Sequence, residues 1–141
     1  MKKTLGWLTL IALIGAALWA LTAWPRLSIV ETGRTPEYPD LQDRTYSARP
    51  ARVGDAVRDA LAERPGWTVV GSGQGPGGVV VSAVHETPLV SFKDDVTVRI
   101  RRKGGQTVVS VRSQSRMGKW DFGQNARNVR DLLQALDAEL H

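Results

Sequence analysis

The sequence contains no cysteine, and only two of its 141 residues are histidine. Without cysteine the chain can form no disulfide, no thiol nucleophile, and no zinc or iron–sulfur site that depends on thiolates. The internal histidine, His85, is followed by Glu86, but no other candidate ligand accompanies the pair at a metal-binding spacing. We therefore expect His85 to be structural, and we expect no metal site and no cofactor.

Concentrated basic charge is also lacking. The formal net charge is +5, and Lys2 and Lys3 supply two of these charges. The longest basic run, residues 101–103, stands beside a Gly-Gly pair. Because nucleic-acid binders usually concentrate lysine and arginine in a run or on one helical face, we expect no nucleic-acid partner. A mild basic excess suits an anionic lipid surface or an acidic partner protein better.

Residues 4–24 carry no charge. As a helix that rises about 1.5 Å per residue, this segment would span about 32 Å, close to the thickness of a hydrocarbon core of about 30 Å. Trp7 and Trp24 stand near its two ends, where aromatic residues gather in membrane helices. The sequence predicts a membrane anchor within residues 1–24.

A cleaved signal peptide is the alternative to an anchor. Its apolar stretch is normally about 7–15 residues long, and its cleavage site requires small residues. The best candidate site, Leu21-Thr22-Ala23, has a bulky leucine where a small residue is needed. We therefore favour an uncleaved, single-pass anchor. In both cases the lysines at positions 2 and 3 should stay in the cytoplasm, which places the rest of the chain on the periplasmic side of a bacterial inner membrane.

Residues 25–43 are predicted to form an extended tether, because three prolines interrupt regular structure there. The folded domain is predicted to occupy residues 44–141 and to begin with a short strand at residues 44–47. An amphipathic helix follows and ends at Pro65-Gly66. Its apolar residues recur at helical spacing: Val53, Ala56, Val57, Ala60 and Leu61.

A glycine-rich run, residues 71–78, separates two predicted strands at residues 67–70 and 79–84. The run contains a formal G-x-G-x-x-G pattern. A dinucleotide site needs a helix after such a loop, so that the helix N-terminus faces the phosphates. Here a strand follows and a proline interrupts the run, so we predict a flexible hairpin loop and no nucleotide site.

The next hairpin has a register that the sequence itself determines. Residues 95–102 and 107–114 flank a Gly-Gly turn, and closing the hairpin there pairs residues whose numbers sum to 209. Apolar residues of both strands then share one face and polar residues share the other, an agreement that a slip of one residue would destroy. A final amphipathic helix is predicted at residues 124–140.

These elements predict an α+β fold. We expect a two-layer sandwich in which two helices cover one face of an antiparallel sheet of about four to five strands, together with the N-terminal transmembrane helix.

The predicted register places Lys93 opposite Arg116, and opposed like charges destabilise a sheet. Two interpretations follow. In the first, Asp95 and Asp121 neutralise Arg112 and Arg116 and clasp the following loop to the sheet; Asp121 could instead lie at the start of the last helix. In the second, the cations outnumber the local acids and leave a site for an external anion, since arginines suit phosphate and carboxylate groups.

Asp94 falls on the apolar face in this register, where a carboxylate needs hydrogen bonds. We expect it to bond to backbone N–H groups at the start of its strand. Paired carboxylates at Asp94, Asp95 and Asp121 would also permit general acid–base catalysis. Because no histidine accompanies them in sequence, and because Ser113 and Ser115 have no base at a recognisable spacing, a small hydrolase is the weaker hypothesis.

Several motifs resemble those of the DUF1499 domain, a mostly bacterial family of unknown function that is often membrane-associated. They are Phe92-Lys93-Asp94-Asp95-Val96, Val98-Arg99, Val111-Arg112-Ser113, Ser115-Arg116, Gly118, Asp121, Gly123 and Asn125-Ala126-Arg127, with Tyr38-Pro39-Asp40-Leu41 and Gly66-Trp67 before them. The resemblance covers about 100 residues and implies no activity. It suggests that the charged cluster is a shared feature of the family.

The sequence therefore predicts a membrane-anchored envelope domain that binds rather than catalyses. The alternatives are the small hydrolase and a purely structural component of a membrane complex. The candidate residues for binding an anionic lipid or an acidic partner are Lys93, Arg99, Arg112 and Arg116. Residues expected to support them are Asp94, Asp95, Ser113, Ser115, Asp121, Asn125 and Arg127.

Overall fold

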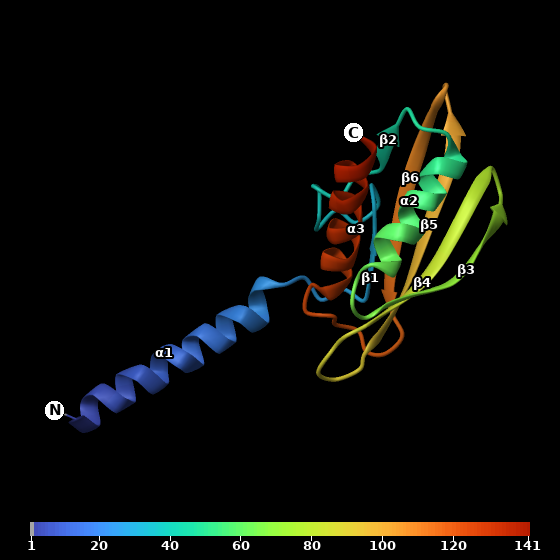
Figure 1. Cartoon of the computed structure of the whole chain (residues 1–141). Helices are drawn as coiled ribbons and strands as arrows, with labels where there is room; N and C mark the ends of the chain where they lie inside the picture. The colour runs from blue at the N-terminus through green and yellow to red at the C-terminus, as the bar shows by residue number, and fades with distance from the viewer. Residues whose placement is uncertain (1) are drawn as a thin grey trace.

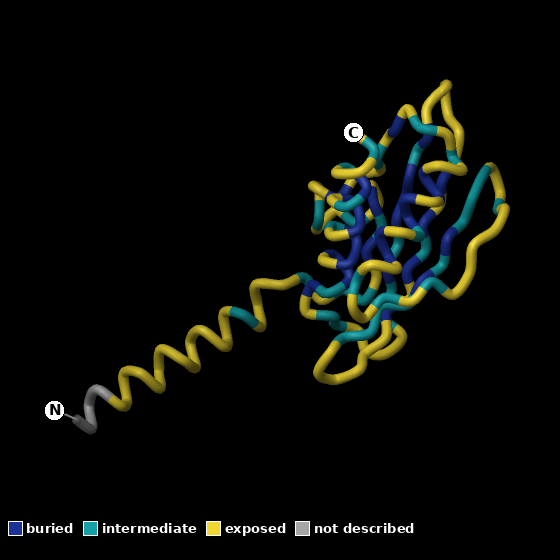
Figure 2. Tube along the Cα trace, in the orientation of Figure 1, coloured by how far each residue is buried: buried dark blue, intermediate teal, exposed yellow. Residues whose placement is uncertain are grey.

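A computed structural model describes residues 2–141, and its side chains from residue 6 onward. The first element is α1 (Lys2–Ala23), which projects away from the rest of the chain (Figure 1). Almost all of its described side chains are exposed (Figure 2). The segment Gly6–Ala23 has a mean hydropathy of 1.8, and by length and composition it could cross a membrane. The chain thus has one N-terminal apolar helix of the kind found in membrane anchors and signal sequences.

The remaining elements form a sheet covered by two helices. The strands are β1 (Ile29–Glu31), β2 (Arg44–Tyr46), β3 (Trp67–Gly75), β4 (Gly78–Glu86), β5 (Lys93–Lys103) and β6 (Gln106–Ser115), and the helices are α2 (Pro50–Ala62) and α3 (Gln124–Leu140). The order in the antiparallel sheet is β1-β6-β5-β4-β3, and β2 also pairs with β6. Both helices lie on one face (Figure 1). The predicted α+β architecture is confirmed, with six strands rather than four to five.

The hairpin of β5 and β6 has the predicted register. Ile100 pairs with Val109, and Val98 pairs with Val111, so that the numbers of each pair sum to 209. Gly104 and Gly105 both have positive φ, at 56° and 82°, as a two-residue hairpin turn of this kind requires. Side chains that the period-2 pattern assigns to the apolar face are fully buried beneath the helices.

The glycine-rich run is strand and turn, not a flexible loop. β3 continues to Gly75 and β4 begins at Gly78, so only two residues connect them. A bulge between Val69 and Gly71 shifts the register, after which Gly73 pairs with Val80. Glycine disfavours strands because of its backbone freedom, which is why the run resembled a loop. Here β3 is the last strand of the sheet, and the valines of β4 supply the apolar side chains.

The segment predicted as a tether, residues 25–43, lies against the domain. β1 pairs with β6, placing Ile29 opposite Gln114, and Val30 is fully buried. Leu41 is only 2% exposed. The prolines do prevent long regular structure, but a three-residue strand and one buried leucine are enough to dock the segment. β1 is the one strand that the sequence did not predict, and it brings the total to six.

The core lies between the helices and one face of the sheet. α2 begins with Pro50, whose fixed φ suits the first position of a helix, and the apolar sides of both helices are buried. The buried apolar side chains include Val53, Val57, Leu61, Val81, Val96, Val98, Ile100, Val109, Val111, Val129, Leu132, Leu133 and Leu136. No described helix covers the opposite face of the sheet, and we refer to it as the open face (Figure 1).

Candidate functional site

The open face carries a row of basic side chains. On β5 the odd-numbered residues point to it, because side chains alternate along a strand and the even-numbered ones enter the core. Arg99 is exposed and Arg112, on the neighbouring strand β6, is partly exposed. Glu31 of β1 pairs with Arg112 in the sheet register. The short strand β1, which the sequence predicts to be part of a tether, therefore adds a carboxylate to this face.

These side chains line a polar cavity of about 270 Å³, which we call the arginine groove. The Glu31 carboxylate lies 3.8 Å from the Arg99 guanidinium and 3.7 Å from that of Arg112. A third arginine, Arg34, lies 3.6 Å from the same carboxylate. The groove is lined by Glu31, Thr32, Arg34, Asp43, Arg99, Arg101, Ser110 and Arg112.

Positive charge exceeds negative charge in the arginine groove, with four arginines against two carboxylates. Among residues 6–141, Arg101 has no carboxylate within ion-pair distance, and it donates one hydrogen bond of 3.3 Å to Ser110 Oγ. Asp43 accepts a hydrogen bond of 2.5 Å from the Thr32 hydroxyl. The Glu31 distances are too long for hydrogen bonds, so the guanidinium donors that face it remain available.

Lys93 and Arg116 lie apart from the groove, at the end of the sheet where β5 begins. Arg116 donates to both oxygens of Asp95, with a shortest distance of 2.7 Å, and these bonds raise the pKa of Arg116 above its ordinary value. Lys93 lies 3.9 Å from Glu86. The predicted binding edge is thus divided into two clusters, and in this second cluster each cation faces its own carboxylate.

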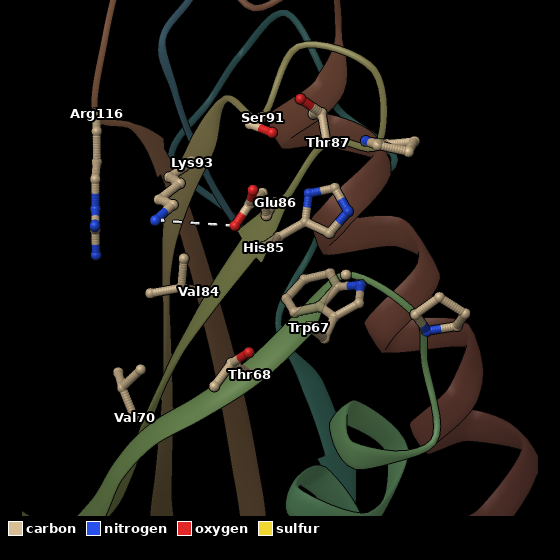
Figure 3. A pocket seen from close by; sticks show the side chains of 13 residues that line it. Trp67, Thr68, Val70, Val84, His85, Glu86, Thr87, Ser91, Lys93 and Arg116 are labelled. Carbon is tan, nitrogen blue, oxygen red and sulfur yellow. Dashed lines mark ion pairs between the residues drawn. The ribbon is translucent and has the colours of Figure 1, made fainter.

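A cavity of about 660 Å³ adjoins this second cluster. In Figure 3, Lys93 and Glu86 face each other across neighbouring strands, and the His85 ring points towards Trp67. The two rings are 4.8 Å apart between centroids. The His85 ring is therefore packed against the Trp67 ring at the edge of this cavity.

Asp94 lies at the centre of a buried polar network on the helix-covered side. It is 2% exposed and accepts hydrogen bonds of 2.9 Å from the Ser115 hydroxyl and 2.9 Å from the Asn128 amide. His85 Nδ1 lies 3.6 Å from its second oxygen. The prediction that Asp94 bonds to backbone N–H groups is wrong, because side chains of β6 and α3 reach it.

The electrostatics of Asp94 follow from this network. Burial alone would raise the pKa of Asp94, but the interactions with His85, Asn128 and Ser115 outweigh it and hold the pKa below the ordinary value. Asp94 is therefore an ionised carboxylate whose two oxygens both accept hydrogen bonds. Two further buried residues complete the network, since the Ser113 hydroxyl donates to Asn125 Oδ1 at 2.6 Å.

Asp121 stabilises the start of α3 and forms no ion pair with any described arginine. Its carboxylate accepts hydrogen bonds from the backbone N–H groups of Gly123 at 2.9 Å and Asn125 at 2.7 Å. This arrangement satisfies donors that a helix N-terminus leaves free. Arg127 donates to the Phe122 carbonyl oxygen and to Gln124. Of the expected clasp, only the contact between Asp95 and Arg116 is present.

The three aspartates proposed for catalysis are engaged in three separate tasks. Asp94 is buried in the network, Asp95 pairs with Arg116 at the surface, and Asp121 caps α3. Asp94 and Asp121 line one cavity of about 340 Å³, but general acid–base catalysis requires a carboxylate that is positioned to exchange a proton with a substrate, and these two are held by hydrogen bonds within the protein. This geometry gives the hydrolase hypothesis no support.

The comparisons with known proteins agree with the motifs. The family profile described as a protein of unknown function (DUF1499) matches residues 21–136. The chain belongs to the DUF1499 family. None of the curated proteins matches it. Among solved structures, protein CV1439 from Chromobacterium violaceum shares 14% identity with this DUF1499 chain, with a TM-score of 0.43. That match covers 80% of this chain and 96% of the other.

Sequence reasoning missed several residues of this DUF1499 site. Arg101 is not among the predicted binding residues, although the predicted register does place it on the polar face beside Arg99 and could have identified it. Glu31 follows a buried valine, but three residues are too few for a period-2 pattern to stand out. Asn128 faces the buried side of α3, and only the tertiary fold brings it to Asp94.

Proposed function

We propose that this DUF1499 domain is a non-enzymatic binding module whose arginine groove receives an acidic segment of a partner protein. The observation that carries the proposal is the loose geometry around Glu31, where three guanidinium groups lie 3.6–3.8 Å from one carboxylate. A carboxylate of a partner could approach these donors without first breaking a short hydrogen bond. Arginine suits this role because its planar fork binds carboxylates with two parallel hydrogen bonds.

The position of the groove favours a protein over a lipid. Arg99 lies six residues along β5 from Lys93, which corresponds to about 20 Å at roughly 3.3 Å per residue. The polypeptide enters the domain from α1 at the Lys93 end. The carbonyl oxygen of Leu27, close to the end of α1, accepts a hydrogen bond from the N–H of Asp121, and Asp121 lines the same cavity as Lys93. The near edge of the groove, at Arg112 opposite Thr97, lies four residues or about 13 Å from that end. This separation favours a protein in the same compartment over lipid head groups.

We propose further that α1 is an uncleaved anchor, with its N-terminus in the cytoplasm and the domain in the bacterial periplasm. The support is the 18-residue apolar segment Gly6–Ala23 together with two lysines at the extreme N-terminus. Positive residues remain preferentially on the cytoplasmic side of a membrane segment. An anchor of this kind would hold the groove at a fixed height above the bilayer.

The binding proposal is tested with a defined acidic probe. The full chain is placed in nanodiscs of zwitterionic lipid, and binding of a fluorescein-labelled oligoglutamate peptide is followed by anisotropy. The double variant Arg99→Ala, Arg112→Ala should weaken binding about tenfold, because two exposed ion pairs contribute up to about 1 kcal/mol each. Added salt should weaken binding by the wild type.

A matched control removes two arginines from the helix side. Arg52 is exposed and Arg130 is partly exposed, and each is paired with a carboxylate at a shortest distance of 2.7 Å. The variant Arg52→Ala, Arg130→Ala has the same net charge as the groove variant. If both double variants weaken binding equally, the peptide senses only the total charge and the groove proposal is wrong.

A further inference from the structure

The exposed large apolar side chains of the domain gather at one end of it. Two loops carry most of them, residues 87–92 between β4 and β5 and residues 116–123 between β6 and α3, and we call these two loops the loop end. Leu89 is 95% exposed and Met117 is 75% exposed. Val90, Phe92 and Phe122 are exposed as well. Apolar groups gathered on one exposed surface commonly mark an interaction site.

The two loops form one continuous surface. Phe92 from the first loop and Met117, Trp120 and Phe122 from the second line the same mainly apolar cavity of about 340 Å³. Both loops lie at the end of the domain from which α1 departs, opposite the tip of the β5–β6 hairpin (Figure 1). The two loops thus present an apolar surface at the end of the domain from which α1 departs.

The charge of the loop end is suited to an anionic surface. Residues 87–92 contain no charged side chain. Lys119 is exposed, and no carboxylate of residues 6–141 lies within ion-pair distance of it or of Arg26. The Arg26 guanidinium lies 5.2 Å from the centre of the Trp120 ring. The acidic residue of the second loop, Asp121, is turned towards the backbone of α3.

Contacts fix the end of α1 beside these loops. A Cβ on Gly123 would lie 3.1 Å from the Trp24 ring, so ring and loop are already in close contact. The N–H of Asp121 donates to the Leu27 carbonyl oxygen at 3.1 Å. Only residues 24–28 separate α1 from β1, and five residues span at most about 18 Å. The loop end is therefore the part of the domain nearest to any bilayer that α1 crosses.

We propose that the loop end inserts into the interfacial region of the bilayer, so that the domain docks on the membrane in one orientation. The inference rests on the proposed anchoring by α1. Leucine and aromatic side chains enter the boundary between head groups and acyl chains, while Lys119 and Arg26 contact anionic lipid head groups. The strands then point away from the membrane, and the arginine groove remains accessible above it.

The absence of cysteine allows a direct test in the full chain. Single cysteines are introduced as Leu89→Cys at the loop end, Gln106→Cys at the β5–β6 tip, and Leu13→Cys in α1, and each is labelled with an environment-sensitive NBD fluorophore. All three side chains are exposed, so labelling should not disturb the core. The proteins are reconstituted into vesicles of phosphatidylethanolamine and phosphatidylglycerol, with nitroxide-labelled acyl chains as quenchers.

We expect nitroxide to quench the label at position 89 severalfold more than the label at position 106. If the labels at positions 89 and 106 are quenched equally and the label at position 13 is strongly quenched, the proposed anchoring by α1 is supported and insertion of the loops is refuted. If position 89 is quenched and position 13 is not, the loops bind lipid and the anchor proposal fails. A label at position 89 that shifts to shorter wavelength but resists nitroxide is covered by protein, and that result also overturns the inference.

Discussion

Asn128 provides the sharpest test of the buried network, because it links α3 to a carboxylate on β5. Its side-chain amide nitrogen donates to Asp94 at 2.9 Å and to Ser113 at 3.2 Å, and Asn128 is 2% exposed. Its oxygen accepts a hydrogen bond of 2.8 Å from Gln124. The variant Asn128→Ala removes all three bonds and leaves Asp94 with one fewer donor.

The expected loss of stability can be worked out from these contacts. A hydrogen bond to a charged group contributes about 1.5–3 kcal/mol, and a neutral one contributes about 0.5–1.5 kcal/mol. The bond from Gln124 is only part-buried, and water can replace it. From the two bonds to Asp94 and Ser113 we therefore expect Asn128→Ala to lower the free energy of unfolding by about 2–4.5 kcal/mol at neutral pH. Urea unfolding of the full chain in a mild detergent, followed by near-ultraviolet circular dichroism, measures this difference.

The same variant predicts a dependence on pH. The folded-state pKa of Asp94 lies below the ordinary value of 3.8, so its stabilising contribution is present above that value and is lost as the pH falls through the folded pKa. In Asn128→Ala the pKa of Asp94 should move upward, because a donor to the ionised form is gone. The difference in the free energy of unfolding between variant and wild type should therefore become smaller below about pH 4.

An exposed position on the same helix supplies the control. Gln134→Ala also replaces an amide side chain on α3 and should change the unfolding free energy by no more than about 0.5 kcal/mol. The role assigned to Asn128 is refuted if Asn128→Ala lowers the free energy of unfolding no more than Gln134→Ala does. It is also refuted if the cost of Asn128→Ala does not decrease in acid.

Three further predictions follow from the sheet and its open face. Glu31→Gln removes the shared carboxylate of the groove and should tighten oligoglutamate binding by about fivefold, since one charge at about 4 Å contributes about 1 kcal/mol in water; unchanged or weaker binding would contradict this. Gly78→Ala should lower the unfolding free energy by about 1–3 kcal/mol, because its Cβ would meet the Ile100 carbonyl oxygen. Gly73→Ala should raise it by about 0.4–1 kcal/mol, since no atom lies within 4 Å of the added Cβ, and equal effects of the two substitutions in urea unfolding would argue against the close pairing of β4 with β5 at Gly78. Arg116→Ala should leave the thermal midpoint unchanged, because both members of its ion pair are about half exposed to solvent, and a clear drop would show that the pair does hold the fold together.

The sequence was most informative where a local pattern and a turn agreed. The β5–β6 register could be derived because Gly104-Gly105 fixes the turn and the valines on both strands alternate in phase with it. That register also placed Arg99 and Arg112 on the polar face. The register and the assignment of residues to faces depend only on neighbouring strands, so both can be predicted from the sequence without knowing how the helices pack.

Features that depend on distant segments could not be predicted. The strand at residues 29–31 forms because Val30 reaches the core beside β6, and nothing in its own sequence distinguishes it from a tether. Glu31 was missed for the same reason. The partner of Asp94 lies 34 positions away on α3, where the sequence shows only a polar residue on a helix. The full length of β3 was not predicted, because glycines have a weak preference for strands and only the pairing with β4 overrides it.

We propose that the open face of this DUF1499 domain binds acidic partners through the arginine groove. Arginine Nε–H resonances of the full chain in nanodiscs, recorded by NMR during titration with oligoglutamate, test it most directly. We expect chemical-shift changes at Arg99, Arg101 and Arg112 that saturate together, and none at Arg52 and Arg130. Shifts of similar size on both faces, or shifts confined to the helix side, would contradict it.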